Sequence, residues 1–425
     1  MKNMSKFQLV FTGIFAAFIV IGVLIFALIK MDSTQTSVVT VWGTMPGMQF
    51  KSFIDQTSLS KDETVSVMYY QKDKDSFDNE LLKAMAVEKG PDVFFLSIES
   101  ILKNKDKLVV VPFENYAERD FKNNFIEEGE LFLTKEGVMA VPLIVDPLVM
   151  YWNRDILGSA GLSNPPKSWK ELYDLAPKLT KKDSSLKISR STVALGEIDN
   201  ITNANEILSA LLIQSGNQIV SYDANQNRYT ANLNDNTKNV FSFYTDFSTS
   251  LKPYYSWNKA LPDSKDYFIS NDLALYFGKA SDYSDIASKN PNLNFDVTYL
   301  PQPDLYDAFI TYGEMQGLAI SRSARDIASA FKVINILTSK DSISALSKVI
   351  NLPPVRRDLL SQKASGTFMP IFYKSAIGAK GWLQPDKTGV DNVYKYAVGL
   401  TNSSNIESSE IVNGMESRLN LLLNQ

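Results

Sequence analysis

Two missing residue types limit the chemistry open to this chain, because its 425 residues include neither cysteine nor histidine. Without thiolate and imidazole groups there is no Ser-His-Asp or Cys-His catalytic system, no disulfide and no zinc site of the usual kind. Carboxylates, amides, hydroxyl groups and aromatic rings remain. Carboxylates and amides bond the hydroxyl groups of a sugar, and flat aromatic rings cover its apolar face. These groups are suited to a sugar-binding site. They also leave open a catalytic mechanism that uses carboxylates alone.

The position of such groups relative to predicted strands narrows the choice. In open α/β sheets, ligands bind beyond the carboxyl ends of strands. The sequence predicts strands at 38–42, 92–96 and 273–277, and another that begins at Val138. The residues at or after the ends of these strands are candidates for ligand binding: Trp42, Gly43, Thr44, Ser97, Glu99, Asp146 and Asp282.

Three more tryptophans are candidates for ligand contact, each with core packing as the alternative. Trp152 ends the continuous apolar run Leu148–Trp152, which favours burial. Trp257 lies in the polar loop PYYSWNK, where either role fits. Trp382 stands in GAKGWLQPD, a loop with glycine and charge on both sides, and large aromatic residues in such loops often serve recognition.

The elements that must position these residues alternate between strands and helices. Val38–Trp42 and Val65–Tyr70 are predicted strands, residues 76–89 form a helix, and Asp92–Leu96 is a buried strand. This β-α-β order predicts a parallel sheet with a right-handed crossover. The alternation recurs further along the chain, so the predicted fold class is α/β.

The amino-terminal segment contains an uncharged, mostly apolar run at Phe7–Ile29. As a helix rising ~1.5 Å per residue, this run is long enough to span a bilayer. Lys2 and Lys6 precede it and Lys30 follows, which favours a cytoplasmic amino terminus and an exported body. A cleaved signal peptide is the alternative, although its apolar core is usually shorter and no A-x-A-like site follows. We predict a membrane anchor at 1–31.

Overall composition excludes one further class of function. The net charge of −4 and the absence of a basic stripe argue against nucleic-acid binding. Apolar residues make up 44% of the chain, which is ordinary for a globular protein, and the length suits a large two-lobed unit.

The most informative motif, at residues 137–180, is GVMAVPLIVDPLVMYWNRDILGSAGLSNPPKSWKELYDLAPKLT. It reads as a strand, an acidic turn, a second strand, a loop, and a helix with Ser168 and Glu171 in a capping box. This motif closely resembles the family 1 extracellular solute-binding proteins of ABC importers, which include maltose-binding-protein-like sugar binders. The segments KAMAVEKGPDVFFLS, GLAISRSARDIASAFKVINILTS and LPPVRRDLL extend the resemblance over most of residues 38–360.

The resemblance implies a fold with two lobes, of the type II periplasmic-binding-protein class, joined by strands that cross between them. It places the acid after the first strand, Asp146, in the ligand cleft, and turns Tyr312 and Glu314 toward the same cleft. Some family members carry an aromatic residue where Ala280 stands here, so one stacking platform is missing. The expected lobes are residues 37–145 with 302–348, and residues 149–298 with 352–425.

The leading hypothesis is a membrane-anchored, extracellular or periplasmic solute-binding subunit that captures a sugar or oligosaccharide. We expect no catalysis, cofactor or metal. The partners would be ABC permease subunits and a separate ATPase, since the chain has no P-loop pattern. A ligand-sensing or adhesion ectodomain is the alternative. A carbohydrate-active hydrolase is a further one, with Asp146 and Glu314 as a carboxylate pair.

Overall fold

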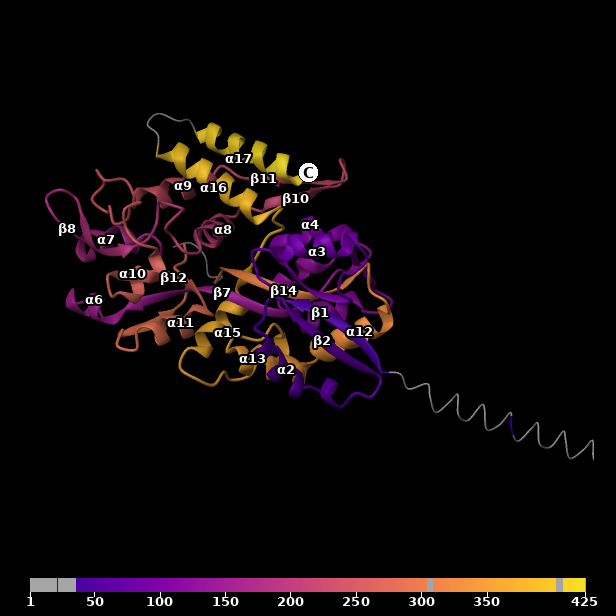
Figure 1. Ribbon diagram of the computed structural model, residues 1–425. Coiled ribbons are helices and arrows are strands. Elements are labelled where there is room, and N and C mark those ends of the chain that lie inside the picture. The colour runs from indigo at the N-terminus through magenta and orange to yellow at the C-terminus, as the bar shows by residue number, and fades with distance from the viewer. Residues whose placement is uncertain (1–20, 22–35, 304–308, 403–407, 425) are drawn as a thin grey trace, which may run out of the picture.

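The computed structural model describes residue 21 and residues 36–303, 309–402 and 408–424. Two hydrophobic cores organise the chain into two lobes (Figure 1). The apolar run Phe7–Ile29 lies outside the described residues except for Ile21. Within the part of the chain that the structure describes, no helix combines the length and apolar character needed to cross a membrane.

One sheet of eleven strands runs through both lobes, and its main path has the order β2-β1-β3-β14-β7-β12-β9-β8. The first lobe holds β1, β2 and β3, with β1 parallel to both neighbours, as the β-α-β pattern predicts. The strands on the main path are β1 (Ser37–Gly43), β2 (Val65–Gln71), β3 (Val93–Ser97), β7 (Val141–Asn153), β8 (Lys181–Lys182), β9 (Ile188–Val193), β12 (Leu273–Lys279) and β14 (Thr311–Ser321). Shorter strands pair at its sides: β4 (Leu108–Val109), β13 (Phe295–Thr298) and β15 (Ala379–Lys380).

Helices cover the sheet of the first lobe. Alternate side chains of β1 and β2 face them, and Tyr69 of β2 stacks on Phe50 of α2 with ring centroids 3.8 Å apart. Because successive side chains of a strand alternate between faces, burying one face leaves the other for different contacts. The helices here are α2 (Gly47–Asp55), α3 (Phe77–Ala86), α4 (Ile101–Asn104), α5 (Glu118–Asn124), α12 (Ile327–Leu337) and α13 (Lys340–Ile350).

The second lobe is built around β12 and the carboxyl-terminal half of β7. Helix α8 is buried along nearly its whole length, and its buried residues include the polar side chains of Asn205, Glu206, Ser209 and Gln214. The strands β10 (Ile219–Asp223) and β11 (Arg228–Asn232) form an antiparallel hairpin, and β11 packs against α17. The helices are α6 (Arg154–Ser159), α7 (Glu171–Leu179), α8 (Ala204–Gln214), α9 (Thr237–Asp246), α10 (Ser264–Ile269), α11 (Asp282–Lys289), α16 (Lys387–Thr401) and α17 (Ser408–Leu423).

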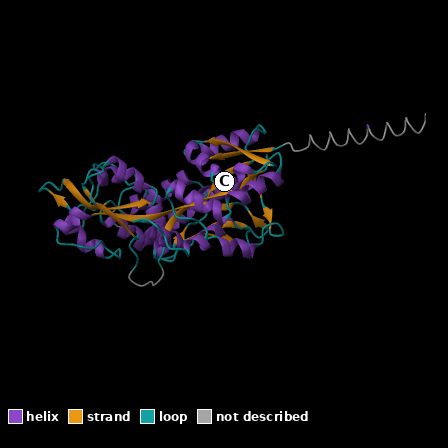
Figure 2. Ribbon diagram, turned by 90° about the horizontal axis from the view of Figure 1, so that it is seen from below, coloured by secondary structure: helices purple, strands orange, loops and turns teal. Residues whose placement is uncertain are grey.

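Two long strands carry the chain between the lobes (Figure 2). On β7, Val145 packs in the first core and Leu148 in the second; on β14, Met315 packs in the first core and Tyr312 in the second. The two strands pair antiparallel, with Glu314 directly opposite Asp146. The lobe boundary therefore falls where these two carboxylates stand side by side.

The carboxyl-terminal lobe boundary differs from the prediction. We expected the chain to remain in the second lobe from residue 352, but Val355 and Leu359 pack in the first core, as does Ala379. A backbone bridge between Phe125 and Arg356 holds α14 (Arg357–Leu360) against the first lobe. The helix α15 (Met369–Ile377) contacts both cores, with Phe372 in the second and Ala376 in the first. Trp382 and the buried apolar residues of α16 and α17 belong to the second core.

Candidate ligand-binding cleft

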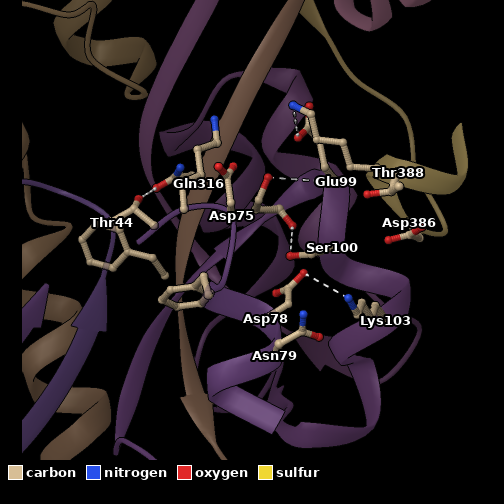
Figure 3. Close-up of a pocket in the computed structure, with 15 residues that line it drawn as sticks. Thr44, Asp75, Asp78, Asn79, Glu99, Ser100, Lys103, Gln316, Asp386 and Thr388 are labelled. Atoms are coloured by element: carbon tan, nitrogen blue, oxygen red, sulfur yellow. Dashed lines mark hydrogen bonds and ion pairs between the residues drawn. The ribbon is translucent and has the colours of Figure 1, made fainter. Parts of the chain in front are cut away.

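Two cavities lie between the lobes. The first cleft cavity, of about 460 Å³, is bounded by first-lobe residues that include Ser97 and Glu99, and by Asp386 and Thr388 from the second lobe. Figure 3 shows Asp386 and Thr388 on their own segment, facing the first-lobe residues. The second cleft cavity, of about 500 Å³, lies between residues 44–49 of the first lobe and residues 279–284 of the second. Thr44, Lys74 and Gln316 line both cavities.

Between these cavities lies a charged floor, made of Glu99, Glu206, Glu314, Lys279 and Lys387. Its three glutamates are 3–6% exposed, and one carboxylate oxygen of each lies within 4.8 Å of the others. The Lys279 ammonium group forms ion pairs with Glu314 and, at 2.9 Å, with Glu206. Lys387 Nζ lies 3.4 Å from carboxylate oxygens of both Glu99 and Glu206. The Glu99–Lys387 pair joins the two lobes directly.

Secondary structure brings these five residues together from distant parts of the chain. Glu99 follows β3 in a short 3-10 turn, and Lys279 is the last residue of β12. Glu206 lies in the first turn of α8, and Lys387 begins α16. Glu314 is on β14, at the crossing. The floor thus collects strand ends and helix starts, where side chains escape the regular packing of a lobe.

Burial and ion pairing compete at each of these groups. Burial by itself would raise the pKa of Glu314, but Lys279, Lys74 and other cations outweigh it and hold that pKa below its usual range. Burial likewise acts to raise the pKa of Glu206, and Lys279 and Lys387 reverse the direction. Burial opposes the charge of Lys279 as well, yet Glu314 and Glu206 raise its pKa well above normal. These three groups are therefore charged at neutral pH.

At Glu99, the effects that raise the pKa outweigh those that lower it. Burial raises its pKa, and the negative charge of Glu314 raises it further, more than Lys387 lowers it. The Tyr312 hydroxyl donates to Glu99 Oε1 at 3.0 Å, and Gln384 Nε2 donates to the Tyr312 oxygen at 3.0 Å. This buried chain links the first lobe to the segment that precedes α16. Buried polar groups paired in this way hold one geometry.

Glu128 lies close to the same floor. Its carboxylate oxygens are buried and have no hydrogen-bond partner among the described residues. They occupy space that a side chain at Gly313 or Gly381 would fill, since a Cβ at either position would lie within 3 Å of them. Burial raises the pKa of Glu128 well above its usual value, and Lys380 opposes this only in part.

Asp146 lies at the edge of the second cleft cavity. Its Oδ1 accepts a hydrogen bond of 3.0 Å from the backbone N–H of Ser281, so it joins the crossing strand β7 to the second lobe. Burial raises the pKa of Asp146 to about 6, while Lys279 pulls it in the opposite direction.

The other candidates, chosen by the strand-end rule or by the family resemblance, have mixed positions. Thr44, Ser97, Glu99, Asp282 and Glu314 line a cleft cavity. Trp42 is partly exposed with Lys72 Nζ 3.9 Å from its ring centroid, and it lines neither cavity. Gly43 is buried, and a Cβ there would lie 2.9 Å from the Phe95 ring. Gly43 is thus a close-packing position.

Three predicted ligand contacts need correction, because Trp152, Trp257 and Trp382 all pack in the second core, at 8%, 0% and 3% exposure. None of them lines either cleft cavity. Each of the last two finds an acceptor for its indole N–H inside its own lobe: Trp257 donates to Asn200 at 3.2 Å and Trp382 to Ser209 at 3.0 Å. Because its indole N–H has an acceptor, each of these two rings can be fully buried, and burial of its large apolar surface stabilises the lobe.

Sequence reasoning did not choose Lys74 or three residues of the charged floor, Glu206, Lys279 and Lys387. Lys279 lies in the stretch Gly278–Asp282 that follows a predicted strand, but only Asp282 of that stretch was chosen. Glu206 carried a weaker signal, as an acid in the first turn of a predicted helix. No pattern in the sequence pointed to Lys74 or Lys387, since each is one of many lysines in polar segments.

Comparison with known sequences identifies the family. The family described as bacterial extracellular solute-binding protein matches residues 49–343, so the chain belongs to it. Curated binding proteins of Brucella abortus (strain 2308) and Brucella suis biovar 1 (strain 1330) are 22% identical over 251 residues, which is 59% of this chain. The match also spans only 59% of the length of each relative.

Solved structures share the fold. A cyclo/maltodextrin-binding protein complexed with maltotetraose is 15% identical, with a TM-score of 0.71 over 91% of this chain and 97% of that one. The GacH receptor of Streptomyces glaucescens GLA.O, solved unliganded and with acarbose, is 15% identical, with a TM-score of 0.69 over 92% and 99%. A solute-binding protein from Thermotoga lettingae bound with alpha-D-tagatose is 19% identical, with a TM-score of 0.65 over 91% and 100%. At these identities the likeness establishes the two-lobed fold.

Proposed function

We propose that this protein is the solute-binding subunit of an ABC importer and that it captures a sugar or oligosaccharide between its lobes. The observation that carries the proposal is the cleft, whose two cavities are each bounded by both lobes and share a floor of buried charged groups. Structural relatives with the same fold are described as bound to maltotetraose and to tagatose, which supports a sugar ligand here.

Capture would work through the crossing strands. The hinge lies where β7 and β14 pass from one core to the other, near Asp146 and Gly313. A ligand stabilises the closed arrangement only if it binds that arrangement better than the open one. Glu99 lines the first cleft cavity from the first lobe. Glu314, on the crossing strand, and Asp282, from the second lobe, line the second cleft cavity. A ligand whose hydroxyl groups bond both sets would therefore hold the lobes together.

The remaining parts of the importer are other proteins. Family membership supports binding without catalysis, with permease subunits and a separate ATPase as partners. The body would lie outside the cytoplasm, and the apolar run at Phe7–Ile29 would tether it to the membrane. The lobes would be close to residues 37–145 with 302–348 and residues 149–298, with the return to the second lobe moved from 352 to the segment near Trp382.

Thermal unfolding of the full-length chain against neutral mono- and oligosaccharides, amino acids and peptides tests the proposal. A sugar present at ~100 times its dissociation constant should stabilise the fold by about 2.7 kcal/mol. Small-angle scattering should show a smaller radius of gyration with the same sugar. If amino acids or peptides give both effects and sugars give neither, the importer role stands and the sugar is wrong. Turnover of a glycoside, lost in Asp146→Ala, would instead support the hydrolase alternative.

A further inference from the structure

The acids of the second cleft cavity differ in their ion pairing. Three acids line it: Asp146, Asp282 and Glu314. Glu314 forms ion pairs with Lys74 and Lys279, and Asp282 pairs with Lys265 at 2.8 Å. Among the described residues, Asp146 forms no ion pair. One of the three carboxylates is therefore left without a cation.

The lysines of this cavity have no spare capacity for Asp146. Lys74 and Lys279 are the basic residues among those that line it. Both are engaged by Glu314, and Lys279 also pairs with Glu206. Lys279 is close enough to lower the pKa of Asp146, but its ammonium group is held by the other two carboxylates. Among the described residues that line the cavity, no lysine pairs with Asp146.

Asp146 keeps room to accept such a group. An ionised carboxylate has about four lone-pair sites, of which Ser281 occupies some: its backbone N–H donates to Oδ1 and its hydroxyl group also bonds the carboxylate. The side chain of Asp146 is partly exposed, and it lines a cavity of about 500 Å³. A volume of this size suits a small ligand. The carboxylate thus combines a charge, free acceptor sites and adjoining space.

The same cavity lacks what a neutral sugar usually stacks on. No aromatic side chain is present among the described residues that line it, and Ala280 borders it. The side chains of Gln49, Asn203, Ser284 and Asn351 line the cavity and can bond hydroxyl groups. The cavity is therefore equipped for hydroxyl groups and for positive charge, but not for ring stacking.

We infer that the ligand carries a basic nitrogen and that the Asp146 carboxylate receives it, so the favoured ligand is an amino sugar with a free, protonated amine. This inference rests on the proposed sugar-binding function and names a class within it. A charge-assisted hydrogen bond from the amine to a partly desolvated carboxylate replaces the missing aromatic platform. The neighbouring amide and hydroxyl side chains bond the hydroxyl groups of the same ligand.

Matched ligands test the inference on the full-length chain. Titration calorimetry at pH 6.5, where most Asp146 carboxylates are ionised and much of the sugar amine is protonated, would compare short β-1,4-linked oligomers of glucosamine, N-acetylglucosamine and glucose, which differ in the group at one ring carbon. The glucosamine oligomer should bind at least ~10-fold more tightly than the glucose oligomer, as expected for one added charge pair. Asp146→Asn should remove that preference, so that the glucosamine and glucose oligomers bind this variant with similar affinities. At pH 5, where Asp146 gains a proton, the preference of the native chain should shrink.

Two control variants test whether the preference for the amine depends on the charge and the position of the Asp146 carboxylate. Asp296→Asn removes an acid of the second lobe that pairs with Arg154 at 3.0 Å and lines neither cavity, so the preference should persist. Asp146→Glu keeps the charge but moves it, so it should weaken the preference while retaining a folded protein. Thermal unfolding of each variant without ligand shows whether it has folded.

The outcomes separate the inference from the proposed function. Equal or tighter binding of the glucose oligomer would overturn the amine and leave the sugar function intact. A preference for glucosamine that persists in Asp146→Asn would overturn the role of Asp146. Binding of a linear polyamine with no binding of any sugar would support the charge assignment and overturn the sugar function.

Discussion

The charged floor of the cleft and the tryptophan-rich core of the second lobe share one helix, yet they satisfy their buried polar groups in opposite ways. On α8, Glu206 meets Lys279 and Lys387 at the floor, while Ser209 one turn further accepts the indole N–H of Trp382. The tryptophan contact closes within one lobe. The floor also takes in Glu99 from the other lobe. A buried group paired inside its lobe contributes to stability, whereas one paired across the boundary ties stability to the relative position of the lobes.

The largest effect should come from removing the central cation of the floor. Lys279→Ala leaves Glu206 and Glu314 buried without their shared partner, and breaking a buried pair in this way costs about 3–5 kcal/mol. Urea unfolding at pH 7 measures the loss. Lys279→Arg keeps the charge and serves as the matched variant. A loss in Lys279→Ala no larger than in Lys279→Arg would mean that the ion pairs contribute little.

A substitution in the second core should lower stability by as much, but it should leave ligand binding unchanged. Trp382→Ala opens a cavity in the second core and should cost about 3–5 kcal/mol in unfolding free energy. Because the ring lines neither cleft cavity, the dissociation constant of any ligand should not change. Calorimetry on the folded variant checks this. A large loss of affinity with little loss of stability would return Trp382 to the ligand site.

A smaller effect is expected at the hydrogen-bond chain between floor and core. Tyr312→Phe removes the hydroxyl that donates to Glu99 and accepts from Gln384, and leaves both groups buried with one partner fewer. Such a change costs about 1–3 kcal/mol. Chemical unfolding of Tyr312→Phe beside Tyr244→Phe, whose hydroxyl donates to the backbone oxygen of Glu197, would isolate the interlobe contribution. Loss of unfolding cooperativity in Tyr312→Phe alone would indicate that the chain couples the lobes.

The smallest effect should depend on pH. Folding raises the pKa of Glu128, so the folded state holds its proton more tightly than the unfolded state. Stability from this group is therefore fully present at low pH and is lost as pH rises above the unfolded value near 4.5. Glu128→Gln removes the loss, so its stability relative to the native chain should grow from pH 5 to pH 8.

The urea midpoints of both proteins at the two pH values provide the measurement. Asp146, whose pKa is also raised, contributes a slope of the same sign to both proteins and so cancels in the difference. If the difference between the proteins is the same at pH 5 and pH 8, Glu128 is not the titrating group.

Much of the fold followed from local pattern. The β-branched strand at 38–42, the helix before Gly90 and the buried strand after Pro91 predicted the parallel pairing of β1 with β2 and β3, and the structure confirms it. Thr44 and Glu99, which were chosen because each follows a predicted strand, both line the first cleft cavity, since the end of a strand on a sheet edge is a local property. The family prediction is confirmed by the match over residues 49–343.

The sequence by itself determined which residues end strands and begin helices, and so which side chains leave the regular packing of a lobe. Only the tertiary structure decided what those side chains meet. Whether the loop around Trp382 turned inward depended on Ser209, and the state of Glu206 depended on Lys279, each far away along the chain. Burial makes every polar group depend on a partner, and that partner is set by packing between distant segments. No local pattern could therefore separate the tryptophans of the core from the charges of the cleft.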